Sequence, residues 1–262
     1  MSLVYVYAVA RAGCAIPPGT PRGIADAAVR VASEGALEAF VSAVPEAEFD
    51  EQPLNEHLRD LAWLTPHAVR HQEVNAALAG GCDPLAPLSF GTVFRDDRRV
   101  LDMLRERRSE LELRLDAIRG KAEWIAVIRR DEAAAASALE TESETLRALQ
   151  AEVSGASPGH AYLLTRRLDE ARRQELRSRD GSAIQDAAAA LEDSGARLFR
   201  EPLVEDTAAG MLARFSVLAD RGGTSALDTA IASFTTRWGD RAYRLELNGP
   251  WPAYRFASVD PE

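Results

Sequence analysis

Two histidines at helical spacing are the residues of this chain whose positions most resemble a metal site. His67 and His71 are four residues apart, so a helix would place both imidazoles on one side, and Glu73 follows closely in the sequence. The HExxH pattern is absent, however, and Glu73 would point to another side of the helix. Val74 and Leu78 share the face of the two histidines. We therefore favour histidines of a core or an interface over a metal site.

The segment PLSFGTVF, residues 87–94, places a serine two residues before a glycine. A hydrolase nucleophile loop would require GxSxG, which is absent, and no histidine or carboxylate is positioned to complete a triad. Proline and β-branched residues instead favour an extended edge segment, in which Gly91 permits close backbone approach. We predict a structural role, with partner binding as the alternative. The candidate contact residues are Leu88, Phe90, Thr92 and Phe94.

A run of arginines makes one stretch basic in an otherwise acidic protein. Its members are Arg166, Arg167, Arg172, Arg173, Arg177 and Arg179, interspersed with Asp169, Glu170 and Glu175. Such a run is usually a solvated helix face. The alternative is a docking site for an acidic partner, because arginine forms bidentate pairs with carboxylates. On that alternative, the candidate residues are Arg166, Arg172 and Arg173.

The motif GPWPAYRF, residues 249–256, combines two prolines with aromatic side chains. This rigid, amphipathic set could close one domain on another or offer an aromatic anchor to a partner. We favour packing within the protein. If the segment binds a partner instead, Trp251 and Tyr254 are the candidate residues.

The composition argues against several classes of function. The chain has 262 residues and a formal net charge of -10, which would repel a nucleic-acid backbone. Its glycines never form GxGxxG or GxxxxGK[ST], so we predict no nucleotide cofactor. We also predict no metal and no catalytic residues, because no constellation of side chains points to a reaction.

The sequence shows neither a signal peptide nor an uncharged apolar run long enough to span a membrane. We therefore expect a cytoplasmic protein without membrane contact. Cys14 and Cys82 are the only cysteines and lack metal or CxxC spacing, so we expect two reduced thiols.

These candidate residues must be positioned by an N-terminal α+β domain, which we place at residues 1–119. The opening run LVYVYAVA predicts a buried strand, and residues 24–45 predict an antiparallel hairpin that turns at Gly35. Residues 53–78 predict one helix that ends at Gly80 and Gly81. A second long helix is expected over 96–119, with a buried stripe of Val100, Leu104, Leu111, Leu115 and Ile118.

The remaining residues, 120–262, show a β-α-β-β-α-β order. Strands are predicted at 121–129, 196–203, 210–219 and 241–249, with a hairpin loop around Glu205 to Ala209. Helices are predicted at about 131–153, 160–193 and 225–238, and the first two form a long helical insertion. This order is typical of a ferredoxin-like domain with an enlarged helical crossover and, here, a C-terminal tail. The predicted fold class is therefore α+β with two domains.

Five blocks of sequence, taken together, resemble the GvpL/GvpF family of gas vesicle proteins. They are LVYVYAVA at 3–10, DLAWLTPHAVRHQEV at 60–74, PLSFGTVF at 87–94, KAEWIAVI at 121–128 and GPWPAYRF at 249–256. Each block is weak alone, but their order and spacing extend over residues 3–256. The resemblance also implies an N-terminal α+β domain and a C-terminal ferredoxin-like domain. The match is least clear over residues 131–193.

The resemblance implies a non-catalytic accessory protein of gas vesicle formation, located in the cytoplasm and associated with the vesicle. It implies contacts with the major gas vesicle shell protein and with other accessory proteins, and no cofactor. The alternative function is a ferredoxin-like module that regulates by binding a small ligand or RNA. RNA is disfavoured, because GMLARFSVLA contains only one aromatic residue where an RNA-binding sheet needs several.

Overall fold

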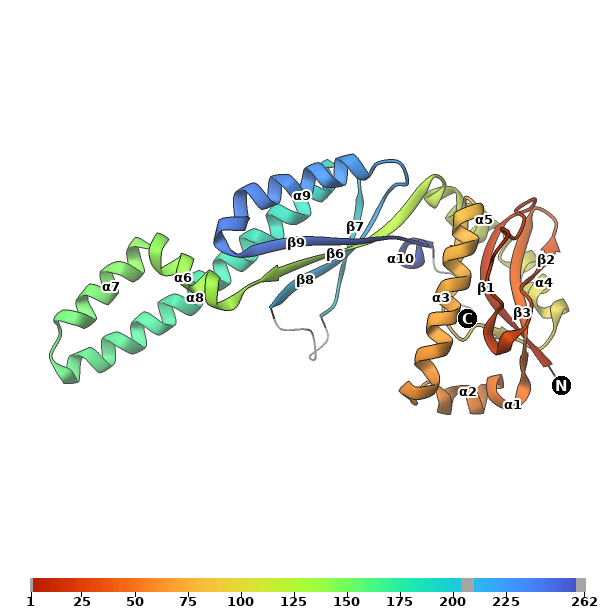
Figure 1. The fold of residues 1–262 in the computed structure, drawn as a ribbon, viewed down its shortest axis with the longest axis horizontal. Helices are drawn as coiled ribbons and strands as arrows, with labels where there is room; N and C mark the ends of the chain where they lie inside the picture. Colours follow the sequence, from red (N-terminus) through yellow and green to blue (C-terminus); the bar gives the residue numbers. More distant parts are fainter. Residues whose placement is uncertain (1, 204–209, 258–262) are drawn as a thin grey trace. The chain divides into compact units, whose positions relative to one another are not determined.

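The computed structural model describes residues 2–203 and 210–257, which form two compact units (Figure 1). The first unit consists of Met1–Glu123 with Pro250–Glu262, and the second of Trp124–Gly249. The chain passes from the first unit to the second after Glu123. The C-terminal tail, which we had placed with the second domain, is grouped with the first unit.

An antiparallel sheet organises the first unit around β1 (Ser2–Arg11). The strand order is β2-β3-β1-β4, in which β2 (Arg30–Glu34) and β3 (Leu37–Pro45) form the predicted hairpin at Gly35. The first strand of this hairpin begins later than predicted, because Ile24–Asp26 forms the 3-10 turn η1. β4 (Leu85–Pro87) and β5 (Val93–Phe94) both pair with β1.

Helices cover both faces of this sheet, which explains why every residue of β1 from Leu3 to Ala10 is buried. They are α1 (Glu46–Phe49), α2 (Glu51–His57), α3 (Leu61–Gly81), α4 (Asp97–Glu106) and α5 (Arg108–Ile118). Figure 1 shows α3 on one side of the sheet and α4 on the other. The stripe predicted for residues 96–119 is buried at all five positions.

Two predicted helices are each divided in the structure. The helix expected over 53–78 is broken between α2 and α3, because the Asp60 side chain accepts a hydrogen bond from the Ala62 N–H and starts a new helix. The helix expected over 96–119 is interrupted at Arg107, whose φ of -99° and ψ of 15° are not helical. Gly120 ends α5 with a φ of 69°, a conformation that glycine adopts readily.

The expectation of two reduced thiols was wrong: a disulfide joins Cys14 and Cys82, with 5.7 Å between their Cα atoms. It connects the segment after β1 to the residue that caps the C-terminus of α3. The sequence separation of 68 residues hid this proximity, since only the packing of α3 against the sheet brings the two cysteines together.

The second unit has the predicted order of elements around a four-stranded sheet, β7-β8-β6-β9. The strands are β6 (Lys121–Arg130), β7 (Arg197–Glu201), β8 (Met211–Asp220) and β9 (Tyr243–Trp251). β6 lies at an inner position, and β7 pairs antiparallel with β8. The predicted loop around Glu205 to Ala209 lies outside the described residues.

The helical crossover of the second unit is a hairpin followed by a long packed helix. It consists of α6 (Glu132–Glu142), α7 (Glu144–Gly155) and α8 (Pro158–Asp193). The helix predicted over 131–153 is split at Ser143, whose hydroxyl accepts from the Leu146 N–H and caps α7. A small apolar cluster, Leu139, Leu146, Leu149 and Leu168, joins these helices. Figure 1 shows α7 and the first half of α8 projecting beyond the sheet.

The second half of α8 lies beside α9 (Thr224–Trp238), and these two helices lie on the same face of the sheet (Figure 1). The 3-10 turn η2 (Gly239–Arg241) then leads into β9. Within the described ranges, no helix is long and apolar enough to cross a membrane.

Candidate functional site

The two histidines of α3 have different environments. His67 is half-buried, stacks on Trp63 with 4.0 Å between ring centroids, and contacts the Trp63 carbonyl oxygen through Nδ1 at 2.6 Å. His71 lies in the core instead, at 4% exposure. The described part of the chain contains no group of three or more histidine, cysteine, aspartate or glutamate side chains able to hold a metal ion. The core interpretation therefore holds for His71.

His71 is the centre of a buried hydrogen-bond network that joins α3 to β1 and the C-terminal tail. Its Nδ1 lies 2.9 Å from the Tyr5 hydroxyl, and its Nε2 lies 3.0 Å from Asn75 Nδ2. The Asn75 amide also donates to the Tyr254 hydroxyl at 2.8 Å. With the amide nitrogen of Asn75 facing the ring, Nε2 of His71 accepts and the imidazole proton is on Nδ1; with the amide turned over, Nε2 carries the proton and Nδ1 accepts from the Tyr5 hydroxyl.

Burial determines the protonation of this network. It lowers the pKa of His71 to about 4, so the imidazole is neutral near pH 7. It also raises the pKa values of the Tyr5 and Tyr254 hydroxyls. Asn75 Oδ1 is buried without a partner among the described residues, and turning the amide over would leave Nδ2 unpaired instead. A neutral network that holds helix to sheet is a structural arrangement, without a nucleophile or a charged base.

The PLSFGTVF segment completes the hydrogen bonding of β1. The Leu88 N–H donates to the Tyr7 carbonyl at 2.8 Å, and the Val6 N–H donates to the Thr92 carbonyl at 3.0 Å. Gly91 has a φ of 87° and its N–H donates to the Tyr5 hydroxyl, so the turn requires a residue that tolerates this backbone. The side chains of Leu88 and Thr92 are buried at 1% and 4% exposure. They are therefore inaccessible to a partner in this structure.

Phe90 and Phe94, the other two candidates of this segment, are only partly buried. Phe90 packs against Tyr5, His71 and Trp63. Phe94 lines an open groove of about 360 Å³ beside β5. The groove has an apolar part formed by Leu3, Phe49, Leu54, Val93 and Phe94, and a polar part formed by Asp50, Glu51, Asn55 and Arg95. We call it the β5 groove.

The arginine-rich stretch lies on α8, and most of its candidate residues are engaged within the protein. Arg172 pairs with Glu140 at 2.8 Å and with Asp169 at 3.2 Å. Arg173 pairs with Glu170 at 2.7 Å. Arg166 is exposed and makes no ion pair within the described ranges. Arg172 and Arg173 are therefore engaged in ion pairs within the protein, whereas Arg166 forms none with a described residue, although no sequence pattern distinguished the three.

The aromatic residues of GPWPAYRF also have different environments. Tyr254 begins α10 (Tyr254–Ala257) and is tied to Asn75, as favoured for packing within the protein. Trp251 is 36% exposed. Glu123, which sequence analysis missed, is buried at 4% exposure and accepts from the Arg255 N–H at 2.8 Å. No sequence pattern indicated it, since a single glutamate in a predicted strand gives no sign of burial.

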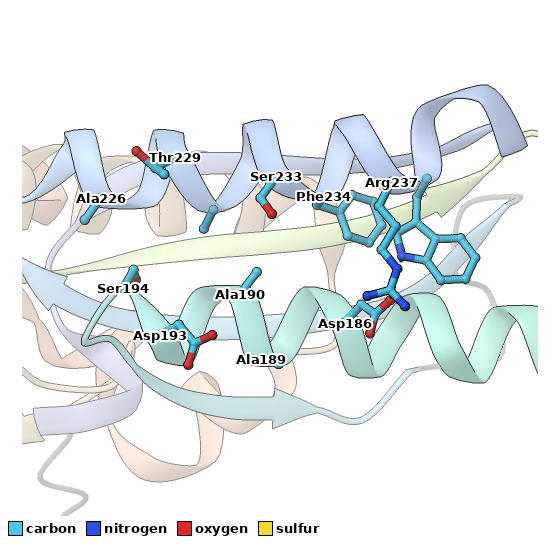
Figure 2. A pocket seen from close by; sticks show the side chains of 12 residues that line it. Asp186, Ala189, Ala190, Asp193, Ser194, Ala226, Thr229, Ser233, Phe234 and Arg237 are labelled. Atoms are coloured by element: carbon cyan, nitrogen blue, oxygen red, sulfur yellow. Dashed lines mark hydrogen bonds and ion pairs between the residues drawn. The ribbon is translucent and has the colours of Figure 1, made fainter.

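A second groove, of about 570 Å³, runs between α8 and α9 (Figure 2). Small side chains such as Ala189, Ala190 and Ala226 form its walls. Asp186 and Arg237 face each other at one end, where Arg237 Nε lies 3.0 Å from the carboxylate (Figure 2). The Trp238 indole N–H donates to the same carboxylate at 2.9 Å. Because Asp186 is already occupied by these two donors, the groove lacks a free charged group at this end.

Comparison with known proteins is consistent along the whole chain. The family model described as "Gas vesicle synthesis protein GvpL/GvpF" matches residues 3–258. Gas vesicle protein L of Streptomyces sp. (strain CB03234) is 32% identical over 276 residues, covering 99% of this chain and 94% of the relative. Gas vesicle protein F of the same organism is 32% identical over 257 residues, covering 96% and 98%. The two identities are equal, so they do not assign the chain to L or to F.

Solved structures share the fold. The crystal structure of GvpF from Anabaena sp. PCC7120 has a TM-score of 0.71 and 17% identity, covering 100% of this chain and 98% of that one. GvpF from Microcystis aeruginosa has a TM-score of 0.67 and 17% identity, covering 98% and 99%. Together with the family match over nearly every residue, these findings establish that the chain belongs to the GvpL/GvpF family of gas vesicle synthesis proteins.

Proposed function

We propose that this protein is a non-catalytic accessory factor that binds the major gas vesicle shell protein during assembly and also contacts other accessory proteins. Membership of the GvpL/GvpF family connects the chain to gas vesicle formation. A protein that forms the wall of a gas space must hide apolar surface before it assembles, and a soluble escort can cover that surface. This role requires a binding surface and no catalytic group.

The observation that carries the proposal is the β5 groove beside an open strand edge. β5 pairs with β1, and none of the described strands pairs with the other edge of β5. An extended segment of a shell subunit could add to this edge through main-chain hydrogen bonds. Phe94, Val93 and Leu54 would then contact its apolar side chains.

The polar part of the β5 groove favours one arrangement of the bound segment. Asp50 and Glu51 lie at the groove with Arg95. A segment with a basic residue next to its apolar residues would place its charge against the two carboxylates. Such a charge determines the direction and partner choice of a complex more than its affinity.

We interpret the second unit as a ferredoxin-like domain, because its strands follow the order β7-β8-β6-β9 with helices in the crossovers. We place the protein in the cytoplasm, associated with the vesicle.

The α8–α9 groove favours small-ligand binding as a second function. RNA binding is disfavoured, because Phe215 of β8 is buried at 4% exposure and is unsuited to stacking on a base.

Co-expression with the major shell protein, followed by affinity capture of this chain, tests the proposal. The variant Phe94→Asp should lose the shell protein, because it places a charge in the apolar part of the β5 groove. Leu113→Asp is the matched control, since Leu113 is 72% exposed on α5 of the same unit. Equal recovery of the shell protein with both variants would reject the β5 groove as its binding site.

A further inference from the structure

Four exposed side chains near the start of α8 form a mixed apolar and basic surface. They are Tyr162, Leu163, Arg166 and Arg167, and we call them the α8 tip patch. Tyr162 is 64% exposed and Leu163 is 63% exposed, among the most exposed large apolar side chains in the described residues. Each apolar residue lies four positions before an arginine, so all four side chains occupy one side of the helix.

The α8 tip patch has no evident role in folding. Leu168 of α8 packs on Leu146 and Leu149 of α7, which accounts for the hairpin. Tyr162 and Leu163 are not among the residues of this α6–α8 cluster. Removing an apolar side chain of this size from water is favourable, so two adjacent exposed residues offer apolar contact surface to a partner.

The arginines of the patch differ from the other arginines of α8. Arg173 and Arg177 both pair with Glu170, and Arg179 pairs with Glu142 at 3.2 Å. Arg166 and Arg167 make no ion pair or side-chain hydrogen bond within the described ranges. Their guanidinium groups are therefore available to carboxylates of another molecule.

We propose that the α8 tip patch binds an amphipathic helix of a partner protein that carries carboxylates beside apolar side chains. Each guanidinium donates two parallel hydrogen bonds to a planar carboxylate of the partner, while Tyr162 and Leu163 contact its apolar stripe. The surface lies in the second unit, so it is separate from the β5 groove. It would allow this chain to hold an accessory protein and a shell subunit at different places.

Charge favours a protein partner over a membrane. Basic segments that bind anionic bilayers carry clusters of about four to eight lysines or arginines, so two arginines provide only weak attraction. The net charge of -10 would oppose it. A partner helix with carboxylates beside its apolar stripe offers acceptors to both arginines without bringing the acidic remainder of the chain against an anionic surface.

Fluorescence anisotropy of the full chain with two synthetic peptides tests this proposal. The probe is a helical peptide with leucines along one side and glutamates four residues apart. The control peptide has the same sequence with each glutamate replaced by lysine. The glutamate peptide should bind to the unchanged chain. The double variant R166E/R167E should weaken this binding by about tenfold or more, because the attraction between arginine and glutamate becomes a repulsion between two carboxylates. The same variant should bind the lysine peptide better than the unchanged chain does.

R98E/R99E is the matched control, because Arg98 and Arg99 are also adjacent and exposed, but lie on α4 of the first unit. This control should keep the affinity of the unchanged chain, whereas Tyr162→Ser with Leu163→Ser should lose it. Equal affinity of the two charge variants would overturn the proposal. Failure of the glutamate peptide to bind would also overturn the proposal if the patch were instead required for binding to vesicles of anionic lipid. The same holds if the patch were required for self-association, measured by sedimentation.

Discussion

Each unit fastens a long helix to its sheet through a tyrosine, but the two networks differ in charge. In the first unit, Tyr5 of β1 meets His71 of α3, and the side chains are neutral and buried. In the second unit, the Tyr243 hydroxyl of β9 donates to Asp180 of α8 at 2.8 Å, and Asp180 also pairs with Arg130 of β6. Asp180 and Arg130 retain 18% and 12% side-chain exposure.

The difference in charge determines how completely each network can be buried. A neutral network can be fully dry, because burying a hydrogen-bonded neutral group costs little compared with burying a charge. An ionic network at the base of the α6–α8 crossover must keep its charges paired, because separating buried charges is expensive. Removing one member should therefore have different consequences in the two units.

The largest loss of stability is expected from Asp180→Ala. This change leaves the Arg130 guanidinium without its main partner and the Tyr243 hydroxyl without its acceptor, at a cost of roughly 3–5 kcal/mol by analogy with broken buried pairs. Urea unfolding followed by circular dichroism measures it. Glu170→Ala on the exposed part of α8 is the control and should leave the midpoint unchanged. A similar midpoint for both variants would mean that the ionic network does not anchor α8.

Reduction of the Cys14–Cys82 disulfide should have the next largest effect, and only in the first unit. The bond closes a long loop, so its loss should destabilise by roughly 2–4 kcal/mol through the freedom that the unfolded chain regains. Urea unfolding with and without dithiothreitol tests this, with Cys14→Ser as the comparison. If the reductant shifts the Cys14→Ser variant as much as the unchanged chain, the disulfide is not responsible.

A pH dependence should distinguish the neutral network. The folded pKa of His71, about 4, lies below the unfolded value of about 6.5, so the unfolded state binds more protons between these values. Stability should therefore fall as pH decreases from about 6.5 to about 4, by about 3 kcal/mol in total. His71→Gln should lack this component. Parallel stability curves for the two proteins over that range would contradict the assignment.

The smallest expected difference compares two single hydroxyl deletions. Tyr5→Phe leaves His71 Nδ1 without its hydroxyl partner and the Gly91 N–H without an acceptor, at roughly 2 kcal/mol. Tyr243→Phe should cost about 1 kcal/mol, because Asp180 keeps its pair with Arg130. Both are measured by thermal and urea unfolding. The reverse order would show that the ionic network depends on its tyrosine more than on its ion pair.

Regular apolar patterns made much of the fold predictable. The continuous apolar run of β1, the stripe over residues 96–119 and the glycine at residue 35 each correspond to an observed element. The helix breaks at Asp60 and Ser143 were missed, because a cap within a continuous helical pattern is a local hydrogen bond that outweighs periodicity. The break at Arg107 was also missed, and it has no side-chain cap that could have indicated it.

The candidate sites were less predictable because they depend on tertiary contacts. Leu88 and Phe94 belong to one short segment, yet only packing against β1 shows that the first is buried and the second lines a groove. Likewise, the ion pairs of Arg172 require Glu140 of another helix. Sequence identified the segment and the basic helix, whereas the accessible residues emerged only from the fold.

Photo-crosslinking from position 94 tests the central claim most directly. Phe94 is replaced by p-benzoylphenylalanine, which retains an aromatic side chain, and the full chain is irradiated in cells that co-express the major shell protein. A crosslink to the shell protein from position 94, and none from the same group at exposed position 113, is the predicted result. Co-purification of the two proteins without any crosslink from position 94 would contradict the β5 groove as the binding site.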